Sequence, residues 1–86
     1  MTKYTYQVRN KQGIHVHTAG QLVKLAKEAS DTSITITKEN KTINATQLMK
    51  LLSLELKQGD ILHITVDGIN ESKTIMKLNQ FLYAYL

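Results

Sequence analysis

The chain has 86 residues, no cysteine and no proline, and 42% of its residues are hydrophobic. This length fits one domain, the lack of cysteine excludes disulfides and Cys-based zinc or thiol sites, and the apolar content argues against disorder. The formal charge is +4, but the lysines are scattered and Arg9 is the only arginine, so no nucleic-acid partner is expected. The sequence shows neither an apolar signal segment nor a membrane-spanning run, so we expect a cytoplasmic protein without direct membrane insertion.

The first half of the chain predicts a strand, a helix and a β-hairpin. Tyr4, Tyr6 and Val8 alternate with polar residues, which is typical of a strand with one buried face, and turn residues follow at 10–13. Apolar residues then recur at helical spacing, in a stripe that contains Ala19, Leu22, Val23, Ala26 and Ala29. In the second predicted strand Ile34 and Ile36 alternate with serine and threonine, and residues 38–40 turn into a third strand at 41–44.

The second half predicts a short helix, a strand and a final helix. The short helix carries Leu48, Leu51 and Leu52, with Asn44 or Thr46 as its candidate N-cap. After a turn at 58–60, a fourth strand has the alternating apolar residues Leu62, Ile64 and Val66. Asn70 is the candidate cap of the last helix, whose predicted inner stripe is Ile75, Leu78, Leu82 and Tyr85.

The order β-α-β-β-α-β-α predicts an α+β fold in a single domain over residues 1–86. A chain this short cannot cover both faces of a sheet with helices. We therefore expect an open-faced two-layer sandwich, in which a four-stranded antiparallel sheet carries three helices on one face.

The segment Gly13–Gly20, with the sequence GIHVHTAG, is the main candidate for chemistry. It enters the first predicted helix, and a helix N-terminus presents unpaired backbone N–H groups that favour a bound anion. Imidazole is a nucleophile near neutral pH. His15 is therefore the candidate phosphoryl acceptor, and the amides of Val16, His17 and Thr18 would hold the phosphate.

Two other readings of the histidines stay open. A single histidine near a loop is often an ordinary surface residue. His15 and His17 form an H-x-H pair, which on a strand would present both rings to a metal, but no third ligand lies nearby in the sequence and we expect no metal. His63 has no partner in the fourth strand, and we expect it to be structural or exposed.

Gly13-Ile14-His15, followed by Ala19, resembles the active-site signature of the HPr family, the histidine-containing phosphocarriers of the bacterial phosphoenolpyruvate:sugar phosphotransferase system. That signature reads roughly G-I/L-H-A-R-P-A. Residues 41–44, followed by residues 48–54, are similar to the third strand and second helix of the family, and the likeness in element order covers the whole chain. The resemblance implies an HPr-like open-faced β-sandwich.

The resemblance also implies a phosphoryl relay. Enzyme I would pass the phosphoryl group of phosphoenolpyruvate to His15, on the ring nitrogen nearer the backbone, and the IIA domain of a sugar permease would then receive it, without a cofactor. Carried over by position, the surface that docks both partners is Val16, Gly20, Leu48, Met49 and Leu52. An apolar surface there would exclude water from the labile phosphoramidate. For Leu48 and Leu52, packing in the helix core is an equal alternative.

Three residues depart from the family signature. Val16, His17 and Thr18 replace its alanine, arginine and proline. Arginine offers a permanent charge and a fork of donors, whereas a neutral imidazole offers one donor. Proline suits a helix first turn because it has no N–H. An ungapped alignment puts Gln47 where some relatives carry the regulatory serine. Thr46, one residue earlier, is a candidate for regulatory phosphorylation only if the alignment is shifted by one position.

These departures keep a second function open, an HPr-like regulatory or adaptor module that binds partners without efficient relay. We expect a monomer, with self-association through the apolar tail at residues 81–86 as the alternative. A small RNA-binding module rests only on the positive charge.

Overall fold

The computed structural model describes all 86 residues, and the predicted element order is confirmed. The elements are β1 (Thr2–Gln7), α1 (Val16–Glu28), β2 (Thr32–Lys38), β3 (Lys41–Asn44), α2 (Leu48–Ser53), β4 (Ile61–Gly68) and α3 (Glu71–Tyr85).

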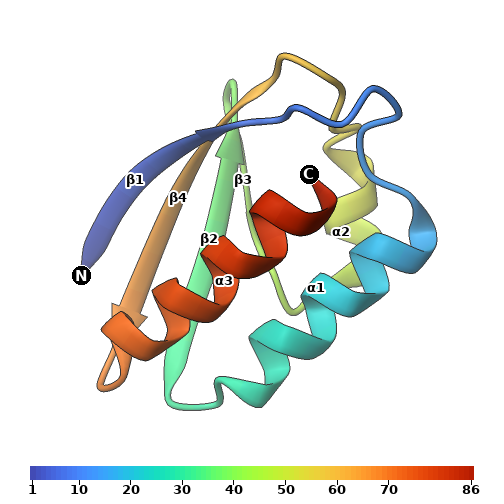
Figure 1. Cartoon of the computed structure of the whole chain (residues 1–86). Helices are drawn as coiled ribbons and strands as arrows, with labels where there is room; N and C mark the ends of the chain where they lie inside the picture. Colours follow the sequence, from blue (N-terminus) through green and yellow to red (C-terminus); the bar gives the residue numbers. More distant parts are fainter.

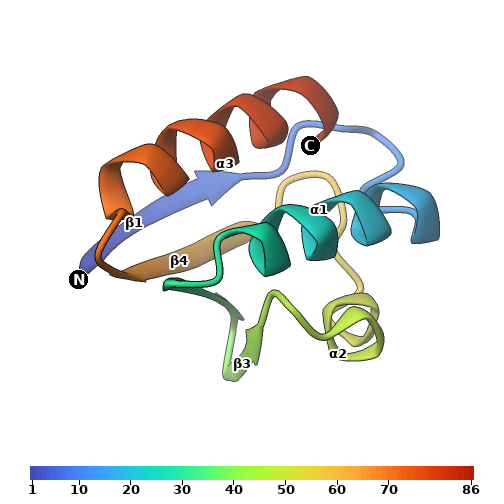
Figure 2. The same cartoon turned by 90° about the horizontal axis from the view of Figure 1, so that it is seen from below.

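The strands form one sheet in the order β1-β4-β2-β3, and every neighbouring pair is antiparallel. Figure 1 shows α1, α2 and α3 on one side of this sheet, and Figure 2 shows the same two layers from below. The predicted α+β sandwich, with three helices on one face, is therefore confirmed. None of the three helices has the length and apolar character that a membrane crossing requires.

The side chains that alternate along the strands divide as predicted between the helix layer and the open face. Twenty buried hydrophobic residues form the core, and those from the strands include Tyr6, Ile34, Ile36, Ile43, Leu62, Ile64 and Val66. Val8 lies beyond the end of β1 but is buried, and its backbone exchanges hydrogen bonds with Asp60 and Gly59 over 2.9 and 2.8 Å. His63 is exposed on the open face, opposite Thr5 and Thr37 of the two neighbouring strands.

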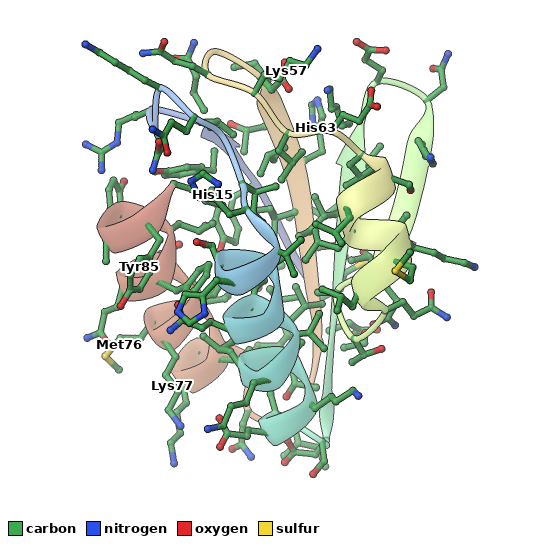
Figure 3. The ribbon with its side chains drawn as sticks, turned by 90° about the vertical axis from the view of Figure 1, so that its right-hand side faces the viewer. His15, Lys57, His63, Met76, Lys77 and Tyr85 are labelled. Carbon is green, nitrogen blue, oxygen red and sulfur yellow. The ribbon has the colours of Figure 1, made fainter.

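The inner stripe of α3 differs from the prediction at its C-terminal end. Thr74, Leu78, Phe81 and Leu82 are buried, but Tyr85 is 47% exposed. Its ring lies 5.1 Å from that of Phe81 and lines a groove between α1 and α3, to which α1 contributes Gln21, Lys24, Leu25 and Glu28. Figure 3 labels Tyr85 near the C-terminal end of α3, with Lys77, which lines the same groove, further along the helix. Tyr85 follows the helical period of the buried stripe, but it lies in this open groove at the end of the helix and stays half exposed.

The predicted side-chain caps are also wrong. Gln47 is the N-cap of α2, while Asn44 Oδ1 accepts hydrogen bonds from the backbone N–H and the hydroxyl of Thr46, which closes a turn before the helix. Asn70 does occupy the N-cap position of α3, but its amide donates to Asp31 Oδ2 over 2.6 Å instead of capping the helix. The side chains of both asparagines therefore make hydrogen bonds outside the helix that follows them.

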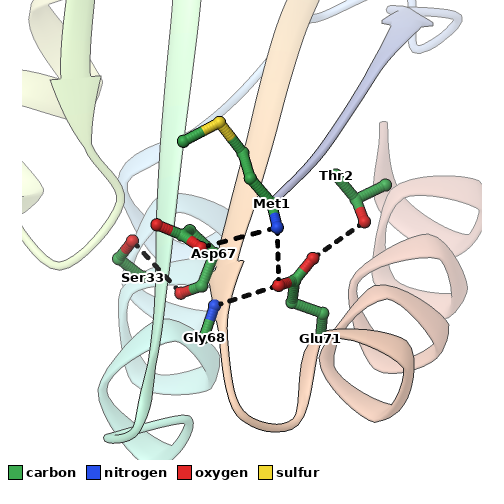
Figure 4. A network of polar contacts seen from close by, with 6 residues as sticks. All are labelled: Met1, Thr2, Ser33, Asp67, Gly68 and Glu71. Atoms are coloured by element: carbon green, nitrogen blue, oxygen red, sulfur yellow. Dashed lines mark hydrogen bonds and ion pairs between the residues drawn. The ribbon is translucent and has the colours of Figure 1, made fainter.

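The start of β1 is tied to the turn between β4 and α3 by the polar network in Figure 4. The Met1 amine donates to Glu71 Oε2 over 2.8 Å, the Gly68 amide donates to the same oxygen, and the Thr2 hydroxyl donates to Glu71 Oε1. The hydrogen bond from the Met1 amine is the largest cause of a lowered pKa for the Glu71 carboxyl. This network holds the edge strand at the end of the sheet remote from His15.

Two tyrosines on the inner face of β1 give a matched stability test. The Tyr4 hydroxyl is buried without a hydrogen-bond partner, whereas the Tyr6 hydroxyl donates to the Leu82 carbonyl over 2.9 Å. We expect Tyr4→Phe to raise the free energy of unfolding by about 1 kcal/mol and Tyr6→Phe to lower it by about 1 kcal/mol, because only the second removes a bond. Urea unfolding measures both, and equal losses would contradict the assignment of the Tyr4 hydroxyl.

The same burial gives Tyr4 a pH signature. Desolvation raises the pKa of Tyr4 to about 12, from about 10 in the unfolded chain. The folded state therefore favours the neutral phenol, and its contribution is complete below pH about 10 and is lost as the pH rises toward the folded value. We expect Tyr4→Phe to flatten the alkaline decline of stability.

Candidate functional site

His15 is the N-cap residue of α1. Its backbone is extended, its carbonyl accepts the first helical hydrogen bond from the Ala19 amide over 2.7 Å, and its side chain makes no capping bond. The imidazole is exposed. Figure 3 shows it where the incoming loop meets the helix. The His15 imidazole, a nucleophilic ring, therefore lies at the start of a 13-residue helix without making a capping hydrogen bond.

The N-terminus of this helix is open. The backbone N–H groups of Val16, His17 and Thr18 have no acceptor within the chain, and the first turn contains no acidic residue. Such unpaired N–H groups carry the positive end of the helix dipole and favour an anion. The first three amides of α1 thus stay unpaired directly after the N-cap residue His15, and their binding of a phosphate stays a prediction.

A close approach at Gly13 determines where the loop enters the helix. Gly13 has φ +69°, its amide donates to the Asn10 carbonyl over 3.0 Å, and the Ile14 amide donates to the Leu56 carbonyl over 3.4 Å. A Cβ atom at Gly13 would collide with the Leu56 carbonyl oxygen. Only glycine combines this positive φ with this contact at no steric cost. The glycine before His15 is therefore required by the loop packing.

Lys38 holds the segment that Gly13 contacts. Its ammonium donates to the carbonyls of Leu54 and Glu55 over 3.0 and 2.9 Å and pairs with Asp60 Oδ2 over 2.8 Å. The ammonium thus pairs with carbonyl oxygens at the end of α2. A positive charge is favourable there because it lies at the negative end of the helix dipole. The hydrogen bond with Lys38 is the largest cause of the lowered pKa of the Asp60 carboxyl.

Asp60→Asn is expected to lower the free energy of unfolding by about 1 kcal/mol at neutral pH, because it removes one partner of a half-buried charged pair. The pKa of Asp60 is lowered in the folded state. Its contribution is therefore present above the ordinary carboxyl pKa of about 4 and is lost as the pH falls through the lowered value.

Urea unfolding over the acid range measures this effect. Glu39→Gln is the matched control, because it removes an exposed carboxylate that makes no hydrogen bond or ion pair. Equal acid dependence in the two variants would show that the ion pair with Lys38 does not contribute.

The five residues of the predicted docking surface lie on α1 and α2, which pack against each other. Val16 and Met49 are 65% and 76% exposed. Leu48 and Leu52 are half-buried and pack against the core, as the core alternative expects, and their part in docking stays a prediction. Gly20 has open space where a Cβ would stand. The helix surface next to His15 thus carries two large apolar side chains in solvent.

The remaining predicted site residues lie as follows. His17 is exposed in the first turn of α1, and Thr18 is half-buried beside it. Thr46 donates its hydroxyl to Asn44 over 2.8 Å and precedes the N-cap of α2 by one residue. No three His, Cys, Asp or Glu side chains come together in a metal-binding group.

Sequence reasoning missed two residues that support the site, Lys38 and Arg9. Lys38 sits in a predicted hairpin and gave no sign of its long-range acceptors. Arg9 entered the sequence argument only as the single arginine, yet it lies in the loop that leads to His15 and contacts α3.

Comparisons with known proteins agree with this geometry. A family model described as "PTS HPr component phosphorylation site" matches residues 2–84. Phosphocarrier protein HPr of Haemophilus influenzae is 42% identical over 66 residues, which are 77% of this chain and 76% of that protein. The HPr of Borreliella burgdorferi is 32% identical over 85 residues and covers 99% of this chain and 98% of its own.

Solved structures give the same result. HPr-C-His from Thermoanaerobacter tengcongensis superposes with a TM-score of 0.88 at 30% identity, over 98% of this chain and 93% of that one. A phosphocarrier protein HPr from Bacillus anthracis gives 0.84 at 27% identity, over 94% and 95% of the two chains.

Proposed function

Because the chain belongs to the HPr family of phosphocarrier proteins, we propose that His15 accepts a phosphoryl group from phosphorylated enzyme I and passes it to the IIA domain of a sugar permease. Phosphoenolpyruvate is the original donor. The observation that carries the proposal is the exposed imidazole at the open N-terminus of α1, beside the three unpaired amides of Val16, His17 and Thr18.

The chemistry asks little of this protein beyond position and charge. A lone pair of the His15 ring nitrogen nearer the backbone attacks phosphorus, a P–N bond forms, and the bond between phosphorus and the donor breaks with its electron pair. The dianion then lies against N–H groups that need no reorganisation to receive it. Transfer to the next acceptor reverses these steps, so the carrier is regenerated.

The apolar helix surface supports the docking part of the proposal. Val16 and Met49 are large side chains in solvent, flanked by the half-buried Leu48 and Leu52. A partner that packs on them removes water from around the phosphoryl group. This accounts for large apolar side chains that remain exposed beside a polar site.

Intact mass after incubation with phosphoenolpyruvate and enzyme I of the source organism tests the proposal. We expect one acid-labile phosphate adduct in the parent protein and none in His15→Ala. The absence of an adduct would favour the adaptor alternative, and an adduct that persists in His15→Ala would move the acceptor elsewhere.

Size-exclusion chromatography at several concentrations tests the expected monomer, because Tyr83 and Tyr85 of the tail are exposed on α3.

A further inference from the structure

The C-terminal turn of α3 is capped by residues that lead toward His15. The last carbonyls of a helix have no partner within it. Here the Tyr6 hydroxyl donates to the Leu82 carbonyl over 2.9 Å and Arg9 Nη2 to the Tyr83 carbonyl over 3.1 Å. Asn10 Nδ2 donates to the Tyr85 carbonyl over 2.9 Å. The end of α3 is thus held by donors from the end of β1 and the loop that follows it.

The backbone amides of Arg9 and Asn10 also donate to the Leu86 carbonyl, and the Arg9 side chain makes two further contacts at this junction. Its guanidinium carbon lies 5.1 Å from the centre of the Tyr83 ring, and its Nε lies 3.4 Å from the Tyr6 hydroxyl. The positive charge therefore stands at the negative end of the α3 dipole. A planar fork that stacks on a ring and donates in two directions suits arginine and not lysine.

The same loop continues directly into the acceptor site. The Asn10 carbonyl accepts the Gly13 amide over 3.0 Å, while Lys11 and Gln12 between them are exposed. On its other side, the Ile14 amide reaches the Leu56 carbonyl over 3.4 Å. The backbone that carries His15 is therefore held at two places, by α3 through residues 9 and 10 and by the segment after α2 through residues 13 and 14.

We propose that Arg9 is a positioning residue for His15. It sets the place of the loop against α3, and the loop sets the angle at which the imidazole stands beside the first-turn amides of α1. This inference rests on the proposed phosphoryl transfer. Loss of Arg9 leaves the nucleophile and the docking surface in place but loosens their alignment, and misalignment of reacting groups slows transfer more than it weakens binding.

Phosphoryl transfer from enzyme I and backbone amide NMR of Arg9→Met, Arg9→Lys and Lys3→Met together test this role. Lys3→Met is the matched control, since it removes one exposed charge on β1 that makes no ion pair. We expect Arg9→Met to lower kcat about tenfold, with KM changed no more than in the control. The amide signals of residues 16–18 should shift in Arg9→Met and stay in place in Lys3→Met, and Arg9→Lys should recover only part of kcat.

Three outcomes would overturn the inference. The first is a kcat in Arg9→Met equal to that of Lys3→Met, and the second is a fall in kcat without any shift of the residue 16–18 amides. The third is full recovery in Arg9→Lys, because charge alone would then suffice. Urea unfolding midpoints identify any variant that fails to fold. If Arg9→Met does not fold, kcat and the residue 16–18 amide signals are compared between Arg9→Lys and its matched control Lys3→Arg, and the inference then requires a lower kcat in Arg9→Lys. If the parent protein accepts no phosphate, the relay fails, while the amide shifts still test the coupling of Arg9 to α1.

Discussion

Replacing His15 with glutamine is expected to abolish phosphoryl acceptance and leave the fold intact. The imidazole is exposed and makes no capping bond, so the free energy of unfolding should change by less than about 0.5 kcal/mol. Glutamine retains polar atoms near the amides of α1 but has no nucleophilic ring nitrogen. Quantitative intact mass after incubation with enzyme I and phosphoenolpyruvate measures the loss.

Substitutions of the two other histidines give the comparison, with His63 as the control. His63 is exposed on the open sheet face, and His63→Gln should leave acceptance unchanged. His17 stands in the first turn of α1, and His17→Ala should slow acceptance about tenfold because one donor to the phosphate is lost. His17→Arg should speed it, since the guanidinium adds a permanent charge and several donors. Acceptance by His15→Gln at the parent rate would place the acceptor elsewhere.

The pattern of strands and helices was predictable because it depends on local spacing of side chains. Successive residues of a strand point to opposite faces, so alternate residues such as Ile34 and Ile36, or Leu62 and Ile64, face the core. The position of His15 was predictable in the same way, since a turn sequence precedes a helical stripe. Its exposure and the open amides beside it then follow from the helix start itself.

Contacts between distant segments were not predictable from local spacing. Asn70 has the residue type of an N-cap, but Asp31, 39 residues earlier in the chain, competes for its side chain. Arg9 reaches a carbonyl 74 residues away, and Lys38 reaches carbonyls 16 and 17 residues away. Such partners exist only after the sheet has placed both segments together. The residues that orient the site are therefore the ones that a motif search omits.

Gly13→Ala is expected to be the most destabilising small substitution near the site. An alanine there must adopt φ +69° and must displace the Leu56 carbonyl from the space of its Cβ. The strain and the displacement together should cost about 2 to 4 kcal/mol of unfolding free energy. Urea unfolding measures this cost. Because the displaced loop carries His15, transfer per folded molecule should also fall about tenfold.

The other three glycines separate the causes. Gly59 has φ +93° with open space around its Cβ position, so Gly59→Ala should cost only the backbone strain, about 1 to 2 kcal/mol. Gly20 in α1 has open space and no positive φ, and Gly20→Ala should stabilise the helix by up to about 1 kcal/mol. Gly68 lies where β4 turns toward α3, and a Cβ atom added there would collide with the Asp31 carbonyl and Thr32. Gly68→Ala should destabilise the fold without slowing transfer per folded molecule. Slower transfer in Gly68→Ala equal to that in Gly13→Ala would mean that general instability, and not the loop before His15, controls the acceptor.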